Sequence, residues 1–176
     1  MSITEAGQQP GPGDTAAIDE IVEVLLRHTR GVDRWDWPAV ESCYHADGVI
    51  NYGVMFQGQS SNYVKMLAAR RTGQNASTAK SFHTVTNPLV RVNGDRAVSE
   101  SYFRTTSQNA EGALSIFYGR YVDSFERRDG RWAVAKRVCV MDLGTPGSPV
   151  KVTDFEQGHT SPDDASDEAF RWLSGR

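Results

Sequence analysis

Two residues of the chain have the types and spacing that suit acid–base chemistry. Asp33 lies in the segment Gly31-Val32-Asp33-Arg34, and His83 lies in Ser81-Phe82-His83-Thr84. An acid on the inner face of an early helix and a histidine on the first strand of a sheet would meet at the bottom of a pocket. A histidine held by a carboxylate can act as a general base, because the carboxylate fixes its tautomer. The alternative is an ordinary buried pair that positions the helix on the sheet.

Arg137 is the second chemical signal. It lies in a segment predicted as the last long strand, on a face of small and apolar side chains: Ala133, Ala135, Cys139 and Met141. Because a buried unpaired charge is costly, Arg137 must find a carboxylate, a carbonyl or an anionic ligand. One interpretation is a structural ion pair with Asp33 or Asp142. The other is stabilisation of negative charge on a substrate oxygen or leaving group.

Helical patterning at the start of the chain would position the aspartate. Residues 1–13 are rich in glycine and proline and are expected to form a flexible tail. Asp14 or Thr15 can then cap a helix whose apolar side chains form one stripe. These side chains are Ile18, Ile21, Val22, Leu25, Leu26 and Val32. At about 100° per residue, the helix brings Asp33 to the edge of the stripe, so its carboxylate is expected to face the core.

A short second helix is predicted after the aspartate. Asp36-Trp37-Pro38 is typical of a cap followed by a proline in the first turn. The helix would run through Tyr44 and close with a turn at residues 45–48.

A hairpin and a third helix follow. Residues 49–56 indicate a short hairpin around Gly53. Ser60 or Ser61 can cap a third helix, for which Gly73 is a suitable stop.

From about residue 80 the pattern changes to strands separated by turns. Asn93-Gly94 and Asp129-Gly130 are hairpin signals, and residues 108–112 form a longer turn. Four successive strands are predicted at residues 81–92, 96–107, 113–127 and 131–143. Three hairpins in series make an antiparallel meander, and the preceding helices must cover one of its faces.

Both faces of the last predicted strand are apolar. Regular alternation groups Trp132, Val134, Val138 and Val140 on one face, opposite the face of Arg137. A sheet buried on both sides needs two covers. We expect the helices to supply one cover and another subunit to supply the other.

The composition fits one globular domain with a small-molecule partner. Apolar residues make up 39% of the 176 residues and charged residues 23%, which allows a single core. The net charge is −3 and the 19 Lys and Arg are scattered, so neither nucleic acid nor a membrane surface is the expected partner. Cys43 and Cys139 are expected to be buried free thiols. Because the sequence offers neither a membrane span nor a secretory signal, a cytoplasmic location is expected.

A resemblance to a known family rests on the order of five short segments. They are Val32-Asp33-Arg34, Asn51-Tyr52-Gly53, Phe82-His83-Thr84-Val85-Thr86-Asn87, Gly119-Arg120-Tyr121-Val122-Asp123 and residues 126–132. In this order the chain resembles the SnoaL-like family of the nuclear transport factor two superfamily. It is most similar to the branch of scytalone dehydratase, hexachlorocyclohexane dehydrochlorinase and bile acid 7α-dehydratase. The resemblance implies an α+β cone of the cystatin-like type, in which N-terminal helices close a pocket formed by a curved antiparallel sheet.

The resemblance covers roughly residues 15–145, and the composition of the two ends sets the remaining limits. The cone domain is expected at residues 14–145, after the tail at 1–13. Residues 146–176 form a C-terminal extension with one short terminal helix at 168–173.

The resemblance implies roles for four residues. Asp33 and His83 match the family's Asp–His dyad. Arg137 matches an arginine of the dehydrochlorinase type, and Tyr52 matches a tyrosine that contacts the substrate carbonyl through water. Two departures separate the chain from scytalone dehydratase. Val32 stands where that enzyme has a second tyrosine, and the second predicted strand lacks its second histidine.

The implied function is that of a cofactor-independent lyase. It would be a dehydratase or dehydrohalogenase acting on a small hydrophobic cyclic substrate through the Asp–His base. An isomerase or cyclase of polyketide or steroid chemistry would use the same residues. A non-catalytic small-molecule binding or subunit-assembly domain is the third alternative. The resemblance also favours a homo-oligomer, and a trimer over a dimer.

Further residues are assigned from their place in the expected fold. The substrate pocket is expected to be lined by Phe56, Met66, Leu67, Phe117, Tyr121 and Met141. The remaining histidines are expected to be structural or solvent-facing: His28, His45 and His159. No metal or organic cofactor is expected, because the sequence has no dinucleotide fingerprint and no clustered metal ligands.

Overall fold

The structure is a computed structural model that describes residues 12–71, 80–109 and 112–145. Four predictions concern other parts of the chain and lie outside the described residues. They are the tail at residues 1–11, the helix stop at Gly73, the extension at residues 146–176 and its short helix.

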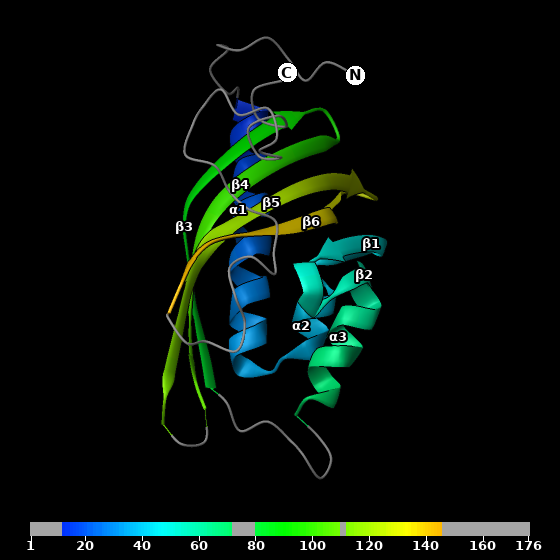
Figure 1. Cartoon of the computed structure of the whole chain (residues 1–176). Helices are drawn as coiled ribbons and strands as arrows, with labels where there is room; N and C mark the ends of the chain where they lie inside the picture. The colour runs from blue at the N-terminus through cyan, green and yellow to red at the C-terminus, as the bar shows by residue number, and fades with distance from the viewer. Residues whose placement is uncertain (1–11, 72–79, 110–111, 146–176) are drawn as a thin grey trace.

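Within the described residues, three α-helices and six strands make up an α+β cone (Figure 1). The helices are α1 (Pro12–Arg34), α2 (Trp37–Glu41) and α3 (Ser60–Ala69). The strands are β1 (Tyr44–Asn51), β2 (Gln57–Gln59), β3 (Lys80–Asn93), β4 (Arg96–Gln108), β5 (Leu114–Arg128) and β6 (Arg131–Gly144), with a 3-10 turn at Gly53–Met55. The strand order is β2-β1-β6-β5-β4-β3. The predicted fold class is confirmed.

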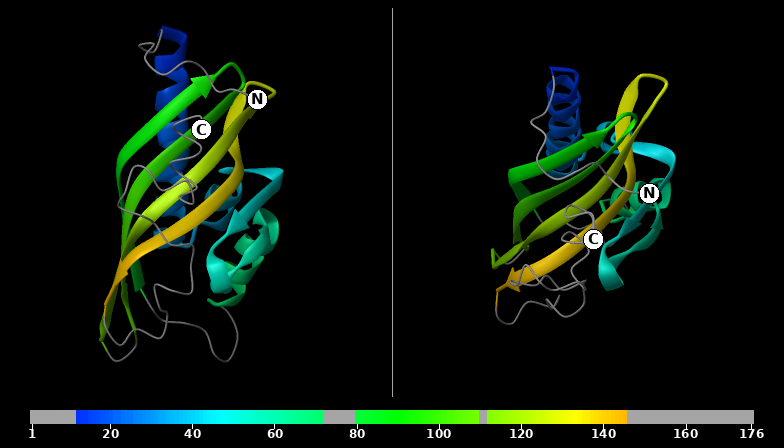
Figure 2. Two further views of the ribbon diagram at one scale, coloured as in Figure 1. Left: turned by 45° about the horizontal axis from the view of Figure 1, so that its top comes forward. Right: turned by 90° about the horizontal axis from the view of Figure 1, so that it is seen from above.

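The curved sheet wraps around α1, which lies along its concave face (Figures 1 and 2). The smaller elements α2, α3, β1 and β2 gather at the β6 edge of the sheet. The core between the helices and the sheet is therefore built from side chains of elements that are distant in the sequence.

An apolar stripe holds α1 on the sheet. Ile21, Val24 and Leu25 are each at most 2% exposed, so the predicted helix and its inward face are confirmed. Leu26 was predicted to join the stripe but is 47% exposed, because it lies beyond the edge of the buried face. The helix begins at Pro12, slightly before the predicted cap, since proline is well tolerated in a first helical turn.

The end of α1 fixes the direction of Asp33. The backbone N–H of Asp36 donates to the Gly31 carbonyl at 2.8 Å, and that of Trp35 donates to the Val32 carbonyl at 3.3 Å. These are the two bonds of a Schellman motif, with Trp35 in the left-handed position at φ 60°. The helix stops immediately after Asp33 has been placed in its last turn.

The second helix is shorter than predicted. Asp36 caps it as expected, with its side chain accepting a hydrogen bond from the Ala39 N–H at 3.1 Å. However, the helix ends at Glu41, and Tyr44 begins β1. The predicted turn at residues 45–48 is therefore wrong. The reason is long-range, because β1 pairs in parallel with β6 and Tyr44 lies opposite Val134.

The third helix and a hairpin around Gly53 are confirmed, but the strands of the hairpin, Tyr44–Asn51 and Gln57–Gln59, extend beyond the predicted residues 49–56 at both ends. β1 and β2 pair antiparallel across Gly53, which has a φ of 54°. Helix α3 begins at Ser60, but its N-cap is Gln59 and makes no side-chain cap bond. The sequence pattern had predicted Ser60 or Ser61 as the N-cap. That prediction is wrong, because both serines lie inside the helix.

The antiparallel meander agrees closely with the sequence. Strands β3 to β6 begin and end within one residue of the predicted limits, and successive strands pair antiparallel. Asp129 and Gly130 have φ values of 51° and 76°, which is the conformation that a tight Asp-Gly hairpin turn requires.

A β-bulge in β6 was not predicted. Ser124 pairs with Lys136, whereas the next residue, Phe125, pairs with Val134. Ala135 is therefore an extra residue in the ladder. Because side chains alternate along a strand, the extra residue moves the following side chains of β6 to the other face, as far as a second register shift between Met141 and Leu143.

The bulge overturns the predicted grouping of apolar side chains on β6. Trp132 and Val134 belong to the main core, on the same side as Arg137. Val138 and Val140 instead belong to a separate buried cluster on the opposite face. The proposal that another subunit covers this outer face stays a prediction.

Gly119 allows close packing between β5 and its neighbours. A Cβ atom at this position would overlap the Val140 carbonyl oxygen and lie 2.8 Å from the Phe103 ring. Because the carbonyl belongs to the paired strand, it cannot move aside cheaply. We expect Gly119→Ala to lower the free energy of unfolding by about 1–3 kcal/mol. Ser115→Ala on the same strand is the control, with an expected change within about 0.5 kcal/mol. Equal urea denaturation midpoints for the two variants would contradict this packing argument.

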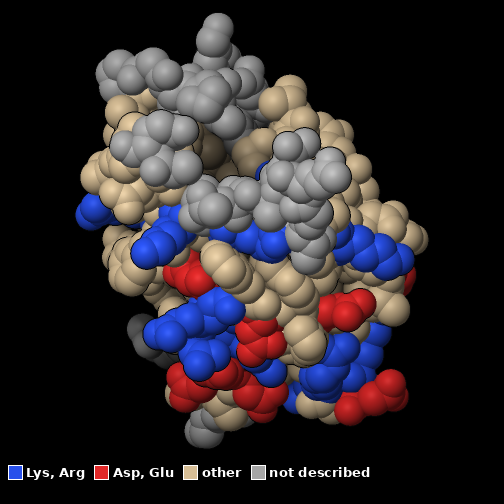
Figure 3. Space-filling view, turned by 90° about the horizontal axis from the view of Figure 1, so that it is seen from below, with Lys and Arg blue, Asp and Glu red and all other residues tan. Residues whose placement is uncertain are grey.

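The surface carries mixed charge. On the face shown in Figure 3, Lys and Arg side chains lie among Asp and Glu side chains. None of the described helices combines the length and apolar character that crossing a bilayer requires. Cys43 and Cys139 are buried free thiols, as predicted.

Candidate active site

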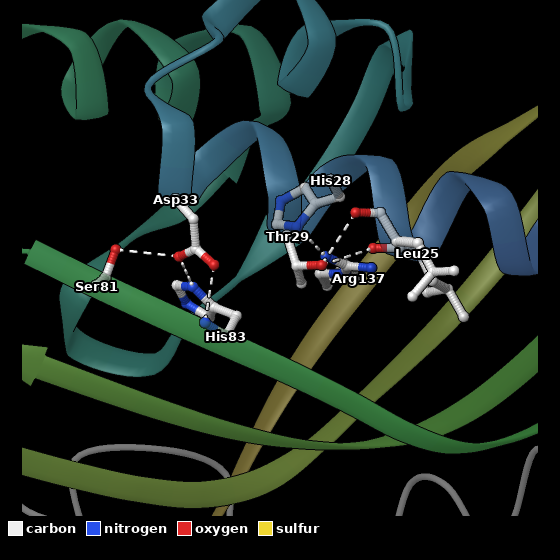
Figure 4. Close-up of polar contacts among 8 residues, drawn as sticks. Leu25, His28, Thr29, Asp33, Ser81, His83 and Arg137 are labelled. Atoms are coloured by element: carbon white, nitrogen blue, oxygen red, sulfur yellow. Dashed lines mark hydrogen bonds and ion pairs between the residues drawn. The ribbon is translucent and has the colours of Figure 1, made fainter.

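Asp33 and His83 meet where the end of α1 crosses the start of β3 (Figure 4). His83 Nδ1 lies 2.6 Å from Asp33 Oδ1, and the His83 backbone N–H donates to Asp33 Oδ2 at 2.9 Å. The Ser81 hydroxyl donates to Oδ1 at 3.3 Å. Three donors from one strand thus fix both oxygens of the carboxylate. The structure brings together the two residues that the sequence paired.

The geometry determines the tautomer of His83. An ionised carboxylate can only accept hydrogen bonds, so Nδ1 of His83 must carry the proton that Asp33 accepts. Nε2 then has a free lone pair, and within the described residues it has no hydrogen-bond partner. The side chains of His83 and Asp33 are 13% and 16% exposed. The imidazole of His83 is thus largely shielded from bulk water, and the lone pair on Nε2 stays unpaired within the described residues.

Arg137 does not join this pair. Its Nε donates to Asp123 Oδ1 at 2.8 Å and its Nη2 to Asp123 Oδ2 at 2.7 Å. The prediction that Arg137 pairs with Asp33 or Asp142 is therefore wrong, because the bulge in β6 brings Arg137 opposite Asp123. Although burial opposes the charge of Arg137, the adjacent carboxylate of Asp123 raises its pKa above the usual range. The guanidinium is 1% exposed and lies over the Tyr121 ring at 4.4 Å.

His28 connects this ion pair to α1. Arg137 Nη1 lies 3.0 Å from His28 Nδ1, and His28 is 2% exposed (Figure 4). Burial lowers the pKa of His28 well below its usual value, and the nearby charges of Arg137 and His83 lower it further. His28 is therefore a neutral imidazole in the core. The structural place expected for His28 from the sequence is thus confirmed, but its contact with Arg137 was not predicted.

The buried neutral state of His28 predicts a pH dependence of stability. Below its ordinary pKa of 6.5, the unfolded chain binds a proton at His28 that the folded chain does not bind. The free energy of unfolding should therefore fall as the pH is lowered through 6.5, by at most about 1.4 kcal/mol per pH unit. His28 lies on α1, and the charged or titratable groups near it are Arg137 on β6, Asp123 on β5 and His83 on β3.

The difference between wild type and His28→Gln isolates this effect in urea denaturation series at several pH values. Burial raises the pKa of Asp123, which works in the opposite direction at lower pH, but Asp123 is present in both proteins. Parallel stability curves for the two proteins between neutral pH and pH values below 6.5 would contradict a buried neutral His28.

Four aromatic side chains of the main core form one continuous wall: Tyr52, Tyr63, Tyr121 and Phe103. Tyr52 is 7% exposed and stacks on Tyr63 with ring centroids 5.1 Å apart. Its ring lies edge-on to Tyr121 at 6.3 Å, and Tyr121 stacks on Phe103 at 4.4 Å. Burial raises the pKa of Tyr63 to about 12, and that of Tyr52 is also raised, so both hydroxyls are neutral near pH 7. Tyr52 is placed in this wall, and its role toward a substrate stays a prediction.

The residues predicted to line the pocket all contribute to the main core. Tyr121 and Met141 are buried in it, and the partly buried members packed against it include Phe56, Met66, Leu67 and Phe117. His45 is structural, as expected, because its Nε2 lies 2.8 Å from the Glu126 carbonyl oxygen. His159 lies outside the described residues. Among the described residues, no group of three or more His, Cys, Asp or Glu side chains could hold a metal ion.

Comparisons with known proteins identify the fold. A scytalone dehydratase-like protein from Novosphingobium aromaticivorans superposes with a TM-score of 0.71 at 18% identity, covering 84% of this chain and 97% of that one. A hexachlorocyclohexane dehydrochlorinase (LinA) type 2 superposes with a TM-score of 0.66 at 19% identity, covering 77% of this chain and 92% of that one. The beta subunit of a protein from N. aromaticivorans that is described as similar to aromatic-ring-hydroxylating dioxygenases superposes with a TM-score of 0.64 at 15% identity. The match covers 82% of this chain and 98% of that one.

The sequence itself gives the family. No curated protein matches the chain significantly. The profile of the SnoaL-like domain matches residues 14–138, which include Asp33, His83, Asp123 and Arg137. The resemblance noted in the sequence is therefore confirmed, and the chain belongs to the SnoaL-like domain family.

Proposed function

We propose that the protein is a cofactor-independent lyase in which His83 removes a proton from a hydrophobic cyclic substrate. The observation that carries this proposal is the 2.6 Å hydrogen bond between His83 Nδ1 and Asp33 Oδ1. It orients a neutral imidazole whose other nitrogen is free to accept a proton. The likeness in fold to a dehydratase-like protein and a dehydrochlorinase supports elimination as the reaction class.

The reaction begins with a C–H bond that a neighbouring carbonyl or leaving group has made acidic. His83 Nε2 takes the proton, and the electron pair of the C–H bond moves into the substrate. Asp33 stabilises the imidazolium that forms, because its carboxylate already accepts the Nδ1 proton. If the leaving group is hydroxyl, the imidazolium can return the proton to it and release water. If it is a halide, the halide leaves as the anion and the proton passes to solvent.

The surroundings of the base suit a hydrophobic ring. The wall of Tyr52, Tyr63, Tyr121 and Phe103 offers flat apolar faces, and the partly buried side chains around it are also apolar. Aromatic faces bind planar or cyclic molecules by area burial with little loss of conformational freedom.

A panel of compounds tests the proposal. Purified protein is incubated in D2O with cyclic β-hydroxy ketones, β,γ-unsaturated cyclic ketones and hexachlorocyclohexane, and the products are analysed by mass spectrometry. Loss of water or hydrogen chloride identifies a lyase. Deuterium incorporation with no elimination identifies the isomerase or cyclase alternative, which shares the base but returns the proton elsewhere. Binding of panel members without either change would overturn catalysis and favour a non-catalytic domain, which the fold also supports.

A further inference from the structure

His28 has one ring nitrogen whose role the fold does not explain. Nε2 is buried and has no hydrogen-bond partner among the described residues, although the side chain is only 2% exposed. Buried polar atoms are nearly always hydrogen-bonded, because an unpaired group loses its interaction with water without replacement. A bound molecule with a matching polar atom would supply the hydrogen bond that the described residues do not.

The hydrogen bond on the other ring nitrogen shows what kind of partner this must be. A guanidinium has only donors, so Arg137 Nη1 must donate to His28 Nδ1, which lies 3.0 Å away. Nδ1 is thus an acceptor, and the single proton of the neutral imidazole is on Nε2. The unexplained nitrogen is a donor, and it needs an acceptor such as a carbonyl or hydroxyl oxygen.

The position of Nε2 directs this donor toward the base. In Figure 4 the ring nitrogen that is not bonded to Arg137 lies on the side of His28 that faces Asp33 and His83. The charge of His83 is close enough to lower the pKa of His28. The two histidines therefore lie near each other in the space between α1 and the sheet, one with a lone pair and the other with an N–H.

Other polar groups without partners lie around His28. The Tyr44 hydroxyl is buried without a partner among the described residues, and its ring is edge-on to His28 at 5.6 Å. The Ser101 hydroxyl is likewise unpaired, and Ser101 lies opposite Tyr121, whose ring is 6.4 Å from His28. An enclosure with several unpaired polar groups among aromatic walls suits an apolar molecule that carries oxygen.

We propose that His28 is a second catalytic residue, whose Nε2–H binds the carbonyl oxygen of a cyclic ketone substrate opposite the His83 base. Arg137 and Asp123 are positioning residues that hold His28 in the donor tautomer. This inference rests on the proposed function and adds its substrate class, a hydrophobic ring that carries a carbonyl group.

His83 Nε2 takes the proton from the carbon next to the carbonyl, and the electron pair of that C–H bond forms the enolate. The negative charge develops on the oxygen that accepts the His28 hydrogen bond, so the bond strengthens in the transition state. The enolate then expels a leaving group from the next carbon or takes a proton back.

1-Tetralone and tetralin test the donor without requiring turnover. The tetralone oxygen can only accept a hydrogen bond, so it discriminates the donor His28 from the acceptor Nε2 of His83. We expect wild type to bind 1-tetralone about 10-fold more tightly than tetralin by calorimetric titration. The infrared carbonyl stretch of the bound ketone should move to lower frequency than in an apolar solvent.

Two variants decide the assignment. His28→Leu should lose both the 10-fold preference and the carbonyl shift, while it continues to bind tetralin. Because this variant leaves Arg137 Nη1 without its acceptor, His28→Gln is the second variant. Its amide oxygen can accept from Arg137 while its NH2 donates to the ketone, so the carbonyl shift should persist. The same carbonyl frequency in wild type and in His28→Leu would overturn the proposal.

The outcomes separate this inference from the proposed function. The carbonyl shift should persist in His83→Ala, which lacks the base, and should disappear in His28→Leu. Turnover of an active panel compound should fall by about 10²- to 10³-fold in His28→Leu, as is usual for loss of one transition-state donor. A carbonyl shift without any turnover would refute the lyase assignment but keep the ketone site. Turnover that is unaffected by His28→Leu would refute the catalytic role of His28 and keep the base.

Discussion

Replacing His83 with alanine is expected to slow turnover of an active panel compound by about 10²- to 10⁴-fold, which is the usual contribution of a positioned general base. The variant removes the imidazole whose Nδ1 donates to the Asp33 carboxylate and whose Nε2 is the proposed proton acceptor. The fold should persist, because the His83 side chain is partly exposed and its backbone N–H still reaches Asp33. The measurement is the initial rate at saturating substrate, together with the urea denaturation midpoint.

Two further variants show whether the loss comes from chemistry. Asp33→Asn should also lower turnover, because an amide no longer stabilises the imidazolium and no longer fixes one tautomer of His83. His45→Gln is the matched histidine control, since His45 only holds the Glu126 carbonyl far from the dyad. It should keep wild-type turnover, with at most a small loss of stability. Wild-type turnover in His83→Ala would eliminate this residue as the base.

Replacing Asp123 with alanine is expected to lower the free energy of unfolding by about 3–5 kcal/mol. Asp123 is 0% exposed, and it holds both Nε and Nη2 of Arg137. Without it, a fully buried guanidinium keeps its positive charge and has no counter-charge in contact. Chemical denaturation in urea at neutral pH measures this loss directly.

The outer face of the same sheet supplies a matched control. Asp142 also pairs with an arginine, but its side chain is 30% exposed and Arg120 has a second partner in Glu100. Asp142→Ala should therefore cost no more than about 1 kcal/mol. Equal losses for the two aspartates would contradict the distinction between the buried pair and the outer network.

A double variant separates stability from positioning. Asp123→Leu with Arg137→Met removes both buried charges, and such exchanges for apolar side chains are often neutral or stabilising. Stability should recover relative to Asp123→Ala. The preference for 1-tetralone over tetralin should nevertheless weaken, because His28 Nδ1 has lost the donor that fixed its tautomer. An unchanged preference would mean that Arg137 and Asp123 are structural only.

Much of the candidate site follows from local patterns in the sequence. The apolar spacing of α1 sets the phase that turns Asp33 inward, and the Schellman end of the helix leaves that phase undisturbed. The Asn-Gly and Asp-Gly signals fix the hairpins, and regular alternation along β3 puts His83 on the face toward α1. The pairing of these two residues also relied on the family resemblance, because periodicity gives faces and not distances.

The second half of the enclosure could not be predicted in the same way. A regular hairpin around Asp129-Gly130 would place Lys136 opposite Asp123, and it is the bulge at Ala135 that brings Arg137 there instead. A single extra residue in a ladder leaves no reliable mark in the sequence, because alanine fits either arrangement. The partner of Arg137 was therefore misassigned.

His28 was missed for a related reason. Its position on the buried stripe of α1 could be read from the spacing, since it follows Leu25 by three residues. A histidine on an apolar face is most often a satisfied core residue, and only the contact with Arg137 reveals that its second nitrogen is an unpaired donor. That contact depends on the bulge, so the sequence alone could not supply it.

The central claim is that two histidines of opposite hydrogen-bonding character face one enclosure, and their tautomers can be measured without any substrate. Long-range ¹⁵N–¹H correlation spectra of protein labelled in its histidines, at neutral pH, distinguish the two neutral tautomers, with assignments from His28→Gln and His83→Ala. We predict that His83 carries its proton on Nδ1 and that His28 carries its proton on Nε2. A proton on Nε2 of His83 would contradict the account, because the nitrogen that must accept the substrate proton would already be occupied.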